Sequence, residues 1–396
     1  MSIMKYKQTG MATLMISVIL LTSIGLMSIY SAQVSVMEQK ISANYYRSTQ
    51  AFESGQAGLD NVIQNLNAQI VDAIAAGGDE NTVFAEADKS LVQLSNSTGT
   101  TGGQSIGSYQ LTVTNNVMVN EVVDSNLVEI TLAGFSGDNN AADAIPNEVI
   151  KQRLFRTPIL NGAPPAPLIA KGDITLNGSV SIENKEEDSL AASWSGGATS
   201  IGTANIDVTS NDGSTVGGYS ENQAALAGLG DDMFGNFFSE SQQSLKNRSK
   251  VVSCNGGSGC SQSNLSTVIN TDGTPKGSNI VWVDAKNVNA EGVTTGYDKL
   301  VIGGSNFQMG TTDNPVILIV DGDFEISGGA DFHGVIYTTQ DFSNGNNDAN
   351  ITGSLISEGN ITATDGLNLT YDNSTFAKMD LSVARYVRVA GSWKDF

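Results

Sequence analysis

The feature that most constrains the fold of this chain is a continuous helical pattern over residues 11–76. Its first part, Met11 to Tyr30, is apolar and uncharged, and no proline interrupts the pattern. At 1.5 Å per residue the apolar part is about 30 Å long, enough to cross a bilayer core, and the whole helix is about 100 Å long. One globular domain cannot bury a helix of that length. We therefore expect residues 11–30 to lie in a membrane or in a bundle of copies.

The second half of the helix carries an apolar face. Its apolar residues recur mostly at intervals of three, four and seven. They are Ile41, Tyr45, Phe52, Leu59, Val62, Ile63, Leu66, Ile70 and Ile74. Gly77 and Gly78 follow as a stop signal.

A short basic leader precedes the apolar segment. Lys5 and Lys7 are its only charges, so the positive-inside rule keeps residues 1–10 in the cytoplasm and exports the rest. Three interpretations are open: a cleavable secretory signal, a plain membrane anchor, and a leader cut on the cytoplasmic side after Gly10. The secretory signal needs a small-x-small cleavage site, and the residues near Ser31 offer only a poor one.

Two motifs resemble those of a known family. The stretch KQTGMATLM, Lys7 to Met15, resembles the class III signal of type IV pilins. The stretch SANYYRSTQAFESGQAGL, Ser42 to Leu59, is similar to the signature of PilX-type minor pilins. The clear resemblance covers about residues 5–66, with weaker echoes later.

The resemblance implies a cut between Gly10 and Met11 by a prepilin peptidase. It also implies one inner-membrane span before assembly, an extracellular pilus afterwards, and other minor and major pilins as partners. Most pilins carry Glu at the fifth residue after the cut, where this chain has Met15. That Glu is thought to neutralise the amino terminus of a neighbouring subunit, and an unpaired charge in an apolar bundle is costly. A tip subunit has no neighbour ahead of it, so Met15 favours a tip or initiating position.

Composition and cysteine usage suit an exported protein. The net charge of −21, from 41 acidic and 20 basic side chains, argues against a nucleic-acid partner, because phosphate contacts need clustered Lys and Arg. The two cysteines, Cys254 and Cys260, enclose a Gly-rich loop, and in an exported chain they predict a disulfide. A metal site there is disfavoured, since the sole histidine, His333, is remote in sequence.

A small sheet is expected after the helix. Alternating apolar and polar residues predict strands at 108–114, 127–133 and 148–156. An antiparallel sheet over 77–160 would cover the apolar face of the helix, which is the α+β plan of pilins. The segment 161–167 holds three of the seven prolines and predicts a short stiff linker.

A seven-residue repeat marks the C-terminal half. Its clear copies are 168–174, 318–324, 336–342 and 355–361, and its looser copies are 282–288 and 301–307. The last five copies end 19, 17, 18 and 19 residues apart, which fits stacked coils. We expect an all-β parallel β-helix, or β-solenoid, over 168–396 with an insertion at 183–279. Within the insertion, Glu221–Asn247 predicts a helix whose aromatic cluster packs on the solenoid; the cluster is Met233, Phe234, Phe237 and Phe238.

One repeat position carries Asp323, Asp341 and Asn360, with Asp173 in the first copy. Aligned along a ladder, these side chains either cap the turns at the corners or bind Ca²⁺, which takes many oxygen ligands. The calcium hypothesis places the ion at Asp323, Asp341 and Asp348. A catalytic carboxylate pair is the third alternative. The sequence holds no Ser-His-Asp set, zinc spacing or phosphate loop, so we expect no enzymatic activity and no cofactor besides this calcium.

The sequence as a whole predicts a minor pilin of a type IV pilus. It would act in the tip or initiating complex, and its solenoid would make adhesion or aggregation contacts with a surface or a glycan. Two alternatives stay open: a minor pseudopilin of type II secretion, and a membrane-anchored β-helix that binds or cleaves polysaccharide.

Overall fold

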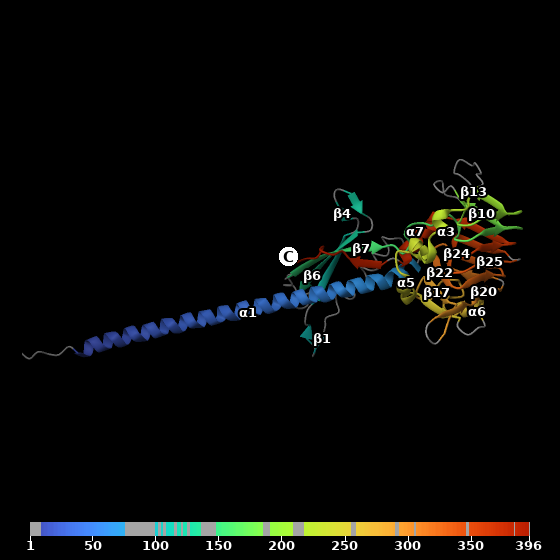
Figure 1. Cartoon of the computed structure of the whole chain (residues 1–396). Helices are drawn as coiled ribbons and strands as arrows, with labels where there is room; N and C mark the ends of the chain where they lie inside the picture. Colours follow the sequence, from blue (N-terminus) through green and yellow to red (C-terminus); the bar gives the residue numbers. More distant parts are fainter. Residues whose placement is uncertain are drawn as a thin grey trace, which may run out of the picture.

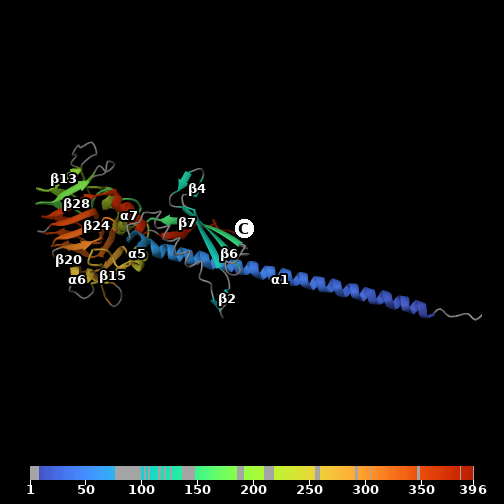
Figure 2. The same cartoon turned by 180° about the vertical axis from the view of Figure 1, so that it is seen from behind.

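The computed structural model is an elongated molecule with three parts (Figures 1 and 2). A long helix projects at one end, a small sheet lies against its second half, and a strand-rich domain lies beyond its C-terminal end. The structure describes residues 9–75, 100–101, 104–105, 108–114, 117–119, 122–124, 127–135, 148–184, 191–208, 218–254, 259–289, 293–304, 306–345, 348–383 and 385–395. Residues 1–8 of the expected leader lie outside this set.

Helix α1 (Thr9–Ala75) confirms the predicted continuous helix. Hydroxyl groups in its apolar part donate back to carbonyls of the preceding turn, as from Ser17 Oγ to Leu14 (2.8 Å) and from Ser28 Oγ to Ile24 (2.9 Å). These hydroxyls therefore bring no unpaired donor into an apolar surrounding. The side chains of residues 11–47 are exposed, and burial begins only beyond them.

The second half of α1 contacts an antiparallel sheet of order β29-β7-β6-β3, with β30 also paired to β7. Its strands are β3 (Ser108–Thr114), β6 (Leu127–Phe135), β7 (Glu148–Thr157), β29 (Arg385–Arg388) and β30 (Lys394–Asp395). Strands β3, β6 and β7 confirm the three predicted strands. Two short ribbons accompany the sheet: β1 (Thr100–Thr101) with β2 (Gln104–Ser105), and β4 (Val117–Val119) with β5 (Val122–Asp124).

The helix and the sheet approach closely where α1 crosses β6. A Cβ atom on Gly134 would lie 2.0 Å from the carbonyl oxygen of Ala51, and one on Gly55 would lie 2.9 Å from Ile150 Cδ1. Ala51 and Leu59 are buried on this same side of the helix. The motif at 42–59 therefore supplies the small and apolar residues that let the sheet lie directly on the helix.

The end of the chain does not belong to the solenoid, so the predicted boundary of 168–396 is wrong there. After the last coil the chain forms helix α7 (Asn373–Val383) and then returns to the sheet, where Arg385 pairs with Thr157 in antiparallel register. The C-terminus consequently lies beside the sheet, midway along the molecule (Figure 1). The solenoid is thus inserted between two neighbouring strands, β7 and β29, of one sheet.

The returning segment is held by contacts with α1 and β7. The Trp393 ring packs edge-on against Phe52 with centroids 6.2 Å apart, and Arg388 forms an ion pair with Asp60. Gln152 Nε2 donates to Ser392 Oγ over 2.6 Å. Sequence patterns missed these strands because they span only four and two residues.

The strand-rich domain is a parallel β-solenoid with three faces. The first face, named here the helix-covered face, runs β14 (Tyr219–Ser220), β11 (Ser193–Ser195), β8 (Leu168–Ala170), β26 (Ala349–Ser357), β24 (Ala330–Thr338), β22 (Val316–Asp321), β17 (Ile280–Asp284) and β15 (Lys250–Ser253). The second, the ladder face, runs β12 (Thr199–Ile201), β9 (Ile174–Leu176), β27 (Ile361–Ala363), β25 (Phe342–Asn344), β23 (Asp323–Ile326), β20 (Lys299–Ile302) and β16 (Cys260–Ser261). The third face runs β13 (Asn205–Val208), β10 (Ser181–Asn184), β28 (Leu367–Tyr371), the first halves of β26 and β24, and β21 (Phe307–Met309).

Strands β24 and β26 each supply two faces because they turn a corner at a glycine. Gly334 and Gly353 are paired across the two strands and have φ of +137° and +138°. A Cβ atom on Gly353 would lie 1.8 Å from the Gly334 carbonyl oxygen. Both the backbone conformation and the close stacking therefore require glycine at this corner.

The strand register confirms the four clear repeat copies. Their first residues pair in succession: Leu318 with Ile336, Ile336 with Leu355, and Leu355 with Leu168. The two looser copies are wrong in register. Trp282 pairs with Ile319, one residue off the expected alignment, and Leu300 pairs with Phe324 and so belongs to another face than predicted. The hairpin of β18 (Lys286–Val288) and β19 (Thr294–Tyr297) lengthens this coil and displaces the repeat.

The chain enters the solenoid next to its last coil, since β8 pairs with β26 and β9 with β27. It runs through β10 to β14 at one end, crosses over, and starts again at β15 and β16 at the other end. The expected insertion at 183–279 is therefore wrong in part, because it contains solenoid strands as well as the crossover. Strand β12, in the coil at this end, is half-exposed to exposed. This coil therefore lacks the buried apolar positions that mark the repeat in the other coils.

Short helices cover the first face. The predicted helix at 221–247 is broken into α3 (Ala224–Ala227), the 3₁₀ turn η1 (Gly230–Asp232), α4 (Met233–Phe237) and α5 (Gln242–Arg248), with Gly230 at φ +55°. The expected aromatic packing is confirmed: Phe234 and Phe238 lie 5.2 and 5.4 Å from the Tyr337 ring. The segment 161–167 is also packed, since the buried Tyr371 hydroxyl donates to the Pro164 carbonyl. A further short helix, α6 (Gln262–Leu265), follows β16.

Candidate functional site

The free half of α1 is the first candidate surface. Met15 is 70% exposed, and every residue from 11 to 47 is exposed with it. Among the described residues, α1 is the one helix long and apolar enough to cross a membrane. An apolar surface of this extent requires lipid or protein around it. Gly10 and the exposed Met11, the residues of the expected cleavage site, lie in the first turns of this helix.

The predicted disulfide between Cys254 and Cys260 is confirmed, with a Cα–Cα distance of 5.1 Å. Both half-cystines are buried. The bond joins the end of β15 to the start of β16 and so closes a corner of the terminal coil. Its contribution is structural, about 2 kcal/mol from restriction of the unfolded chain.

The acidic ladder caps the corner of the solenoid. Each side chain accepts a hydrogen bond from the backbone N–H at the same position of the next coil: Asp341 N to Asp323 Oδ1 (3.2 Å), Asn360 N to Asp341 Oδ1 (2.7 Å) and Asp173 N to Asn360 Oδ1 (2.9 Å). The side-chain oxygens thus satisfy backbone donors where the chain turns.

The proposed calcium ligands are not brought together. Asp341 directly precedes β25, whereas Asp348 directly precedes β26. The described residues contain no group of three His, Cys, Asp or Glu side chains placed to hold a metal ion. His333 lies beside the bend in β24, where burial lowers its pKa against the opposing effect of Asp331. The calcium prediction combined Asp341, at a repeat position, with Asp348, which lies outside the repeat, and the geometry of the coil separates the two.

Replacing Asp341 with alanine is expected to lower the free energy of unfolding by about 1 kcal/mol, because the Asn360 N–H loses a charged acceptor. The loss should be equal in calcium and in chelator, measured by thermal unfolding of the full chain in detergent. Asp348→Ala, an exposed carboxylate off the ladder, is the control and should change stability little. A calcium-dependent rise in Tm that Asp341→Ala abolishes would contradict the capping role.

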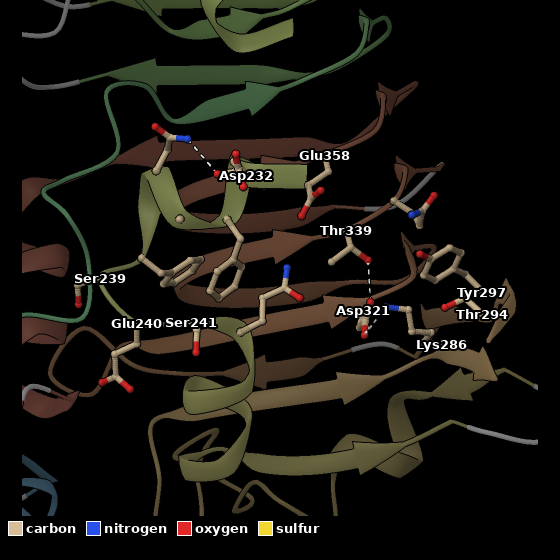
Figure 3. A pocket seen from close by; sticks show the side chains of 16 residues that line it. Asp232, Ser239, Glu240, Ser241, Lys286, Thr294, Tyr297, Asp321, Thr339 and Glu358 are labelled. Carbon is tan, nitrogen blue, oxygen red and sulfur yellow. Dashed lines mark hydrogen bonds and ion pairs between the residues drawn. The ribbon is translucent and has the colours of Figure 1, made fainter. Parts of the chain in front are cut away.

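A cleft of about 860 Å³ lies at another corner of the solenoid (Figure 3). There the helix-covered face meets the crossover helices, which are α3, α4 and α5 in the segment between β14 and β15. One wall comes from η1, α4, the start of α5 and the segment between α4 and α5, with Asp232, Glu240 and Ser241. The opposite wall is the β18–β19 hairpin, with Lys286, Thr294 and Tyr297. The base is a row on the solenoid corner: Asp321, Thr339, Gln340 and Glu358.

The cleft is acidic and internally hydrogen-bonded. Asp321 accepts from Thr339 Oγ1 over 3.2 Å and lies 3.8 Å from Lys286 Nζ. Glu358 accepts from the buried Tyr337 hydroxyl over 2.7 Å, and burial with this carboxylate raises the Tyr337 pKa well above its ordinary value. The phenol is therefore a fixed donor that orients Glu358 at neutral pH.

Sequence reasoning missed this cleft although the repeat carried a signal for it. Asp321, Thr339 and Glu358 each occupy the fourth position of a clear repeat copy, two residues before the corner ladder. A polar residue at the same place in successive coils predicts a second ladder. The crossover helices and the hairpin, which turn that ladder into a cleft, follow from no repeat.

Comparisons with known proteins give a family match at the N-terminus and distant structural likenesses. Residues 9–60 match the family described as PilX N-terminal. A search of curated proteins finds no match. Among solved structures, an ice-binding protein from an Antarctic biological consortium is 13% identical, with 54% of this chain and 91% of that one covered and a TM-score of 0.26. The competence-associated pilin ComZ from Thermus thermophilus is 11% identical, with 88% and 97% covered and a TM-score of 0.25.

A long N-terminal helix, apolar and free in its first half and packed on an antiparallel sheet in its second, defines a pilin-like class of protein. The family match makes the likeness more specific: residues 9–60 are similar to the N-terminal part of PilX-type pilins. Structural likenesses at 11–13% identity do not bring those proteins' activities to this chain.

Proposed function

We propose that this chain is a minor pilin of a type IV pilus that acts in the tip or initiating complex. Its partners are other minor and major pilins, and a prepilin peptidase cuts it between Gly10 and Met11. It is held in the inner membrane by α1 and then enters the extracellular pilus. Its role is structural and adhesive, without enzymatic activity.

The observation that carries this proposal is the position of the solenoid beyond the C-terminal end of α1 (Figures 1 and 2). In a filament of parallel helices, a domain in this position occupies the space of the subunits ahead. A subunit at the tip has none ahead of it, so the domain is accommodated. Met15 supports the same position, because it offers no carboxylate to a preceding amino terminus.

The tip position is tested by immunogold electron microscopy with an antibody against the solenoid. We expect gold at one end of each filament. Gold spaced along the shafts of unmodified filaments would contradict the proposal, and a strain lacking the protein serves as the control for antibody specificity.

Gly10→Val is expected to block leader removal, since peptidases of the resembled family accept only a very small residue there. Intact-mass spectrometry of the membrane-bound protein should then show the full leader. Gly25→Val is the matched control: it changes a glycine of the same helix whose Cβ would meet no atom within 4 Å, and cleavage should proceed. A mature N-terminus near Gln33 would instead support a secretory signal.

A further inference from the structure

We propose that the cleft of Figure 3 binds a segment of a non-acidic oligosaccharide, neutral or carrying free amino groups. The proposal deepens the proposed adhesive function and rests on it for access, because a tip position points the solenoid away from the cell. The cleft volume of about 860 Å³ lies within the range of protein sites for compact ligands.

The first argument is hydrogen-bonding capacity. Sugar hydroxyls both donate and accept, so a sugar site needs side chains of both kinds. Carboxylates of Asp232 and Glu358 accept, while the amides of Gln242 and Gln340 and the hydroxyl of Thr294 donate or do both. Phe234 and Phe238 also border the cleft, but they are buried and stacked on each other at 4.4 Å, so little apolar surface remains for a lipid or an apolar peptide.

The second argument is charge. Four carboxylates line the cleft against one cation, Lys286, which already lies near Asp321. Glu240 is paired with Arg248, whereas Asp232 is exposed at the opposite wall from the hairpin. The surplus of negative charge disfavours sialylated or uronic-acid chains and favours neutral sugars or ammonium-bearing ones.

The third argument is the aromatic rim. Tyr297 is 38% exposed at the end of β19, and Lys286 Nζ lies 5.9 Å from its ring centroid. The hairpin thus presents a ring that is held from one side and partly open to solvent. A flat aromatic surface beside polar groups suits the apolar face of a pyranose ring.

A second hollow of about 280 Å³ continues the cleft, since Gln242, Lys286 and Asp321 line both. Trp282 lines this hollow as well; the residue is 2% exposed, and its Nε1–H has no acceptor among the described residues. Two connected hollows fit a chain of more than one sugar better than a monosaccharide.

Binding is tested with the full chain in detergent micelles against three immobilised oligosaccharide sets: neutral hexose, free-amine amino sugar, and uronic acid. We expect binding to one or both non-acidic sets and none to the uronic-acid set. Tyr297→Ala should weaken binding about tenfold. Tyr219→Ala is the matched control, because Tyr219 is 50% exposed on β14 of the same solenoid but outside the cleft. Asp232→Lys should weaken amino-sugar binding more than neutral binding.

No binding to either non-acidic set, a preference for uronic acid, or equal affinities for the unmodified protein and Tyr297→Ala would each overturn the proposal. Gold labelling at filament tips would then still stand, so a failure of the glycan site is distinguishable from a failure of the tip assignment. If gold lies along the shafts and sugar binding still depends on Tyr297, the tip position alone would be contradicted.

Discussion

Removal of residues 385–396 is expected to unfold the pilin-like sheet while the solenoid stays folded. The deletion takes away β29 and β30, both partners of β7 on one edge, together with the contacts of Arg388 and Trp393 to α1. Tyr386 in β29 is 4% exposed, and losing such an aromatic side chain alone costs about 3 kcal/mol or more. The total is a large part of the stability of a small domain, about 5–15 kcal/mol.

Limited proteolysis of the full chain in detergent, read by mass spectrometry, measures this effect. Cleavage should appear rapidly in β6 and β7, whereas fragments of the solenoid should persist. Tyr386→Ala should reproduce much of the loss, and Val387→Ala, the 45% exposed neighbour on the same strand, should not. Equal protection of β7 with and without the C-terminal residues would show that the return of the chain is dispensable.

Gly134→Val is expected to separate α1 from its sheet. The new Cβ would lie 2.0 Å from the backbone oxygen of Ala51, and a backbone atom cannot move aside as a flexible side chain can. We expect a loss of about 3 kcal/mol, at the upper end of overpacking effects. A mutated subunit should accordingly unfold at lower temperature and enter filaments poorly.

The matched control is Ala133→Val, which introduces the same residue at the adjacent, half-exposed position of β6. Thermal unfolding of both proteins, with tryptophan fluorescence as the probe, separates a contact at Gly134 from a general effect on the strand. A Gly134→Val protein with an unchanged Tm would mean that helix and sheet are not in contact there in solution.

Local sequence patterns were sufficient for several elements. The continuous helix followed from an unbroken run without proline and from regular apolar spacing, both local properties of the chain. Strands β3, β6 and β7 followed from alternation. The ladder face followed from a repeat whose copies stack directly, as the pairing of Phe324 with Phe342 and of Phe342 with Ile361 shows. The disulfide followed from two cysteines only six positions apart.

The cleft could be predicted only in part. Its solenoid side was encoded at the fourth repeat position, in Asp321, Thr339 and Glu358. Its other side comes from Asp232 and Tyr297, which lie outside every repeat copy. No spacing rule relates a crossover helix or a hairpin to a coil that it covers, because their meeting depends on where the chain re-enters the solenoid.

The membrane-length helix, strands β3, β6 and β7 and the stacking period of the solenoid could thus be predicted from the sequence, because each is set by residues close together in the chain. The domain boundaries, in contrast, follow from long-range pairing in the folded protein. The pairing of Arg385 with Thr157 closes the first sheet around the whole solenoid, and the pairing of Leu355 with Leu168 places the first coil beside the last. Both depend on contacts between segments roughly 190 to 230 residues apart, which are selected by the fit of the folded parts and leave no local pattern in the chain.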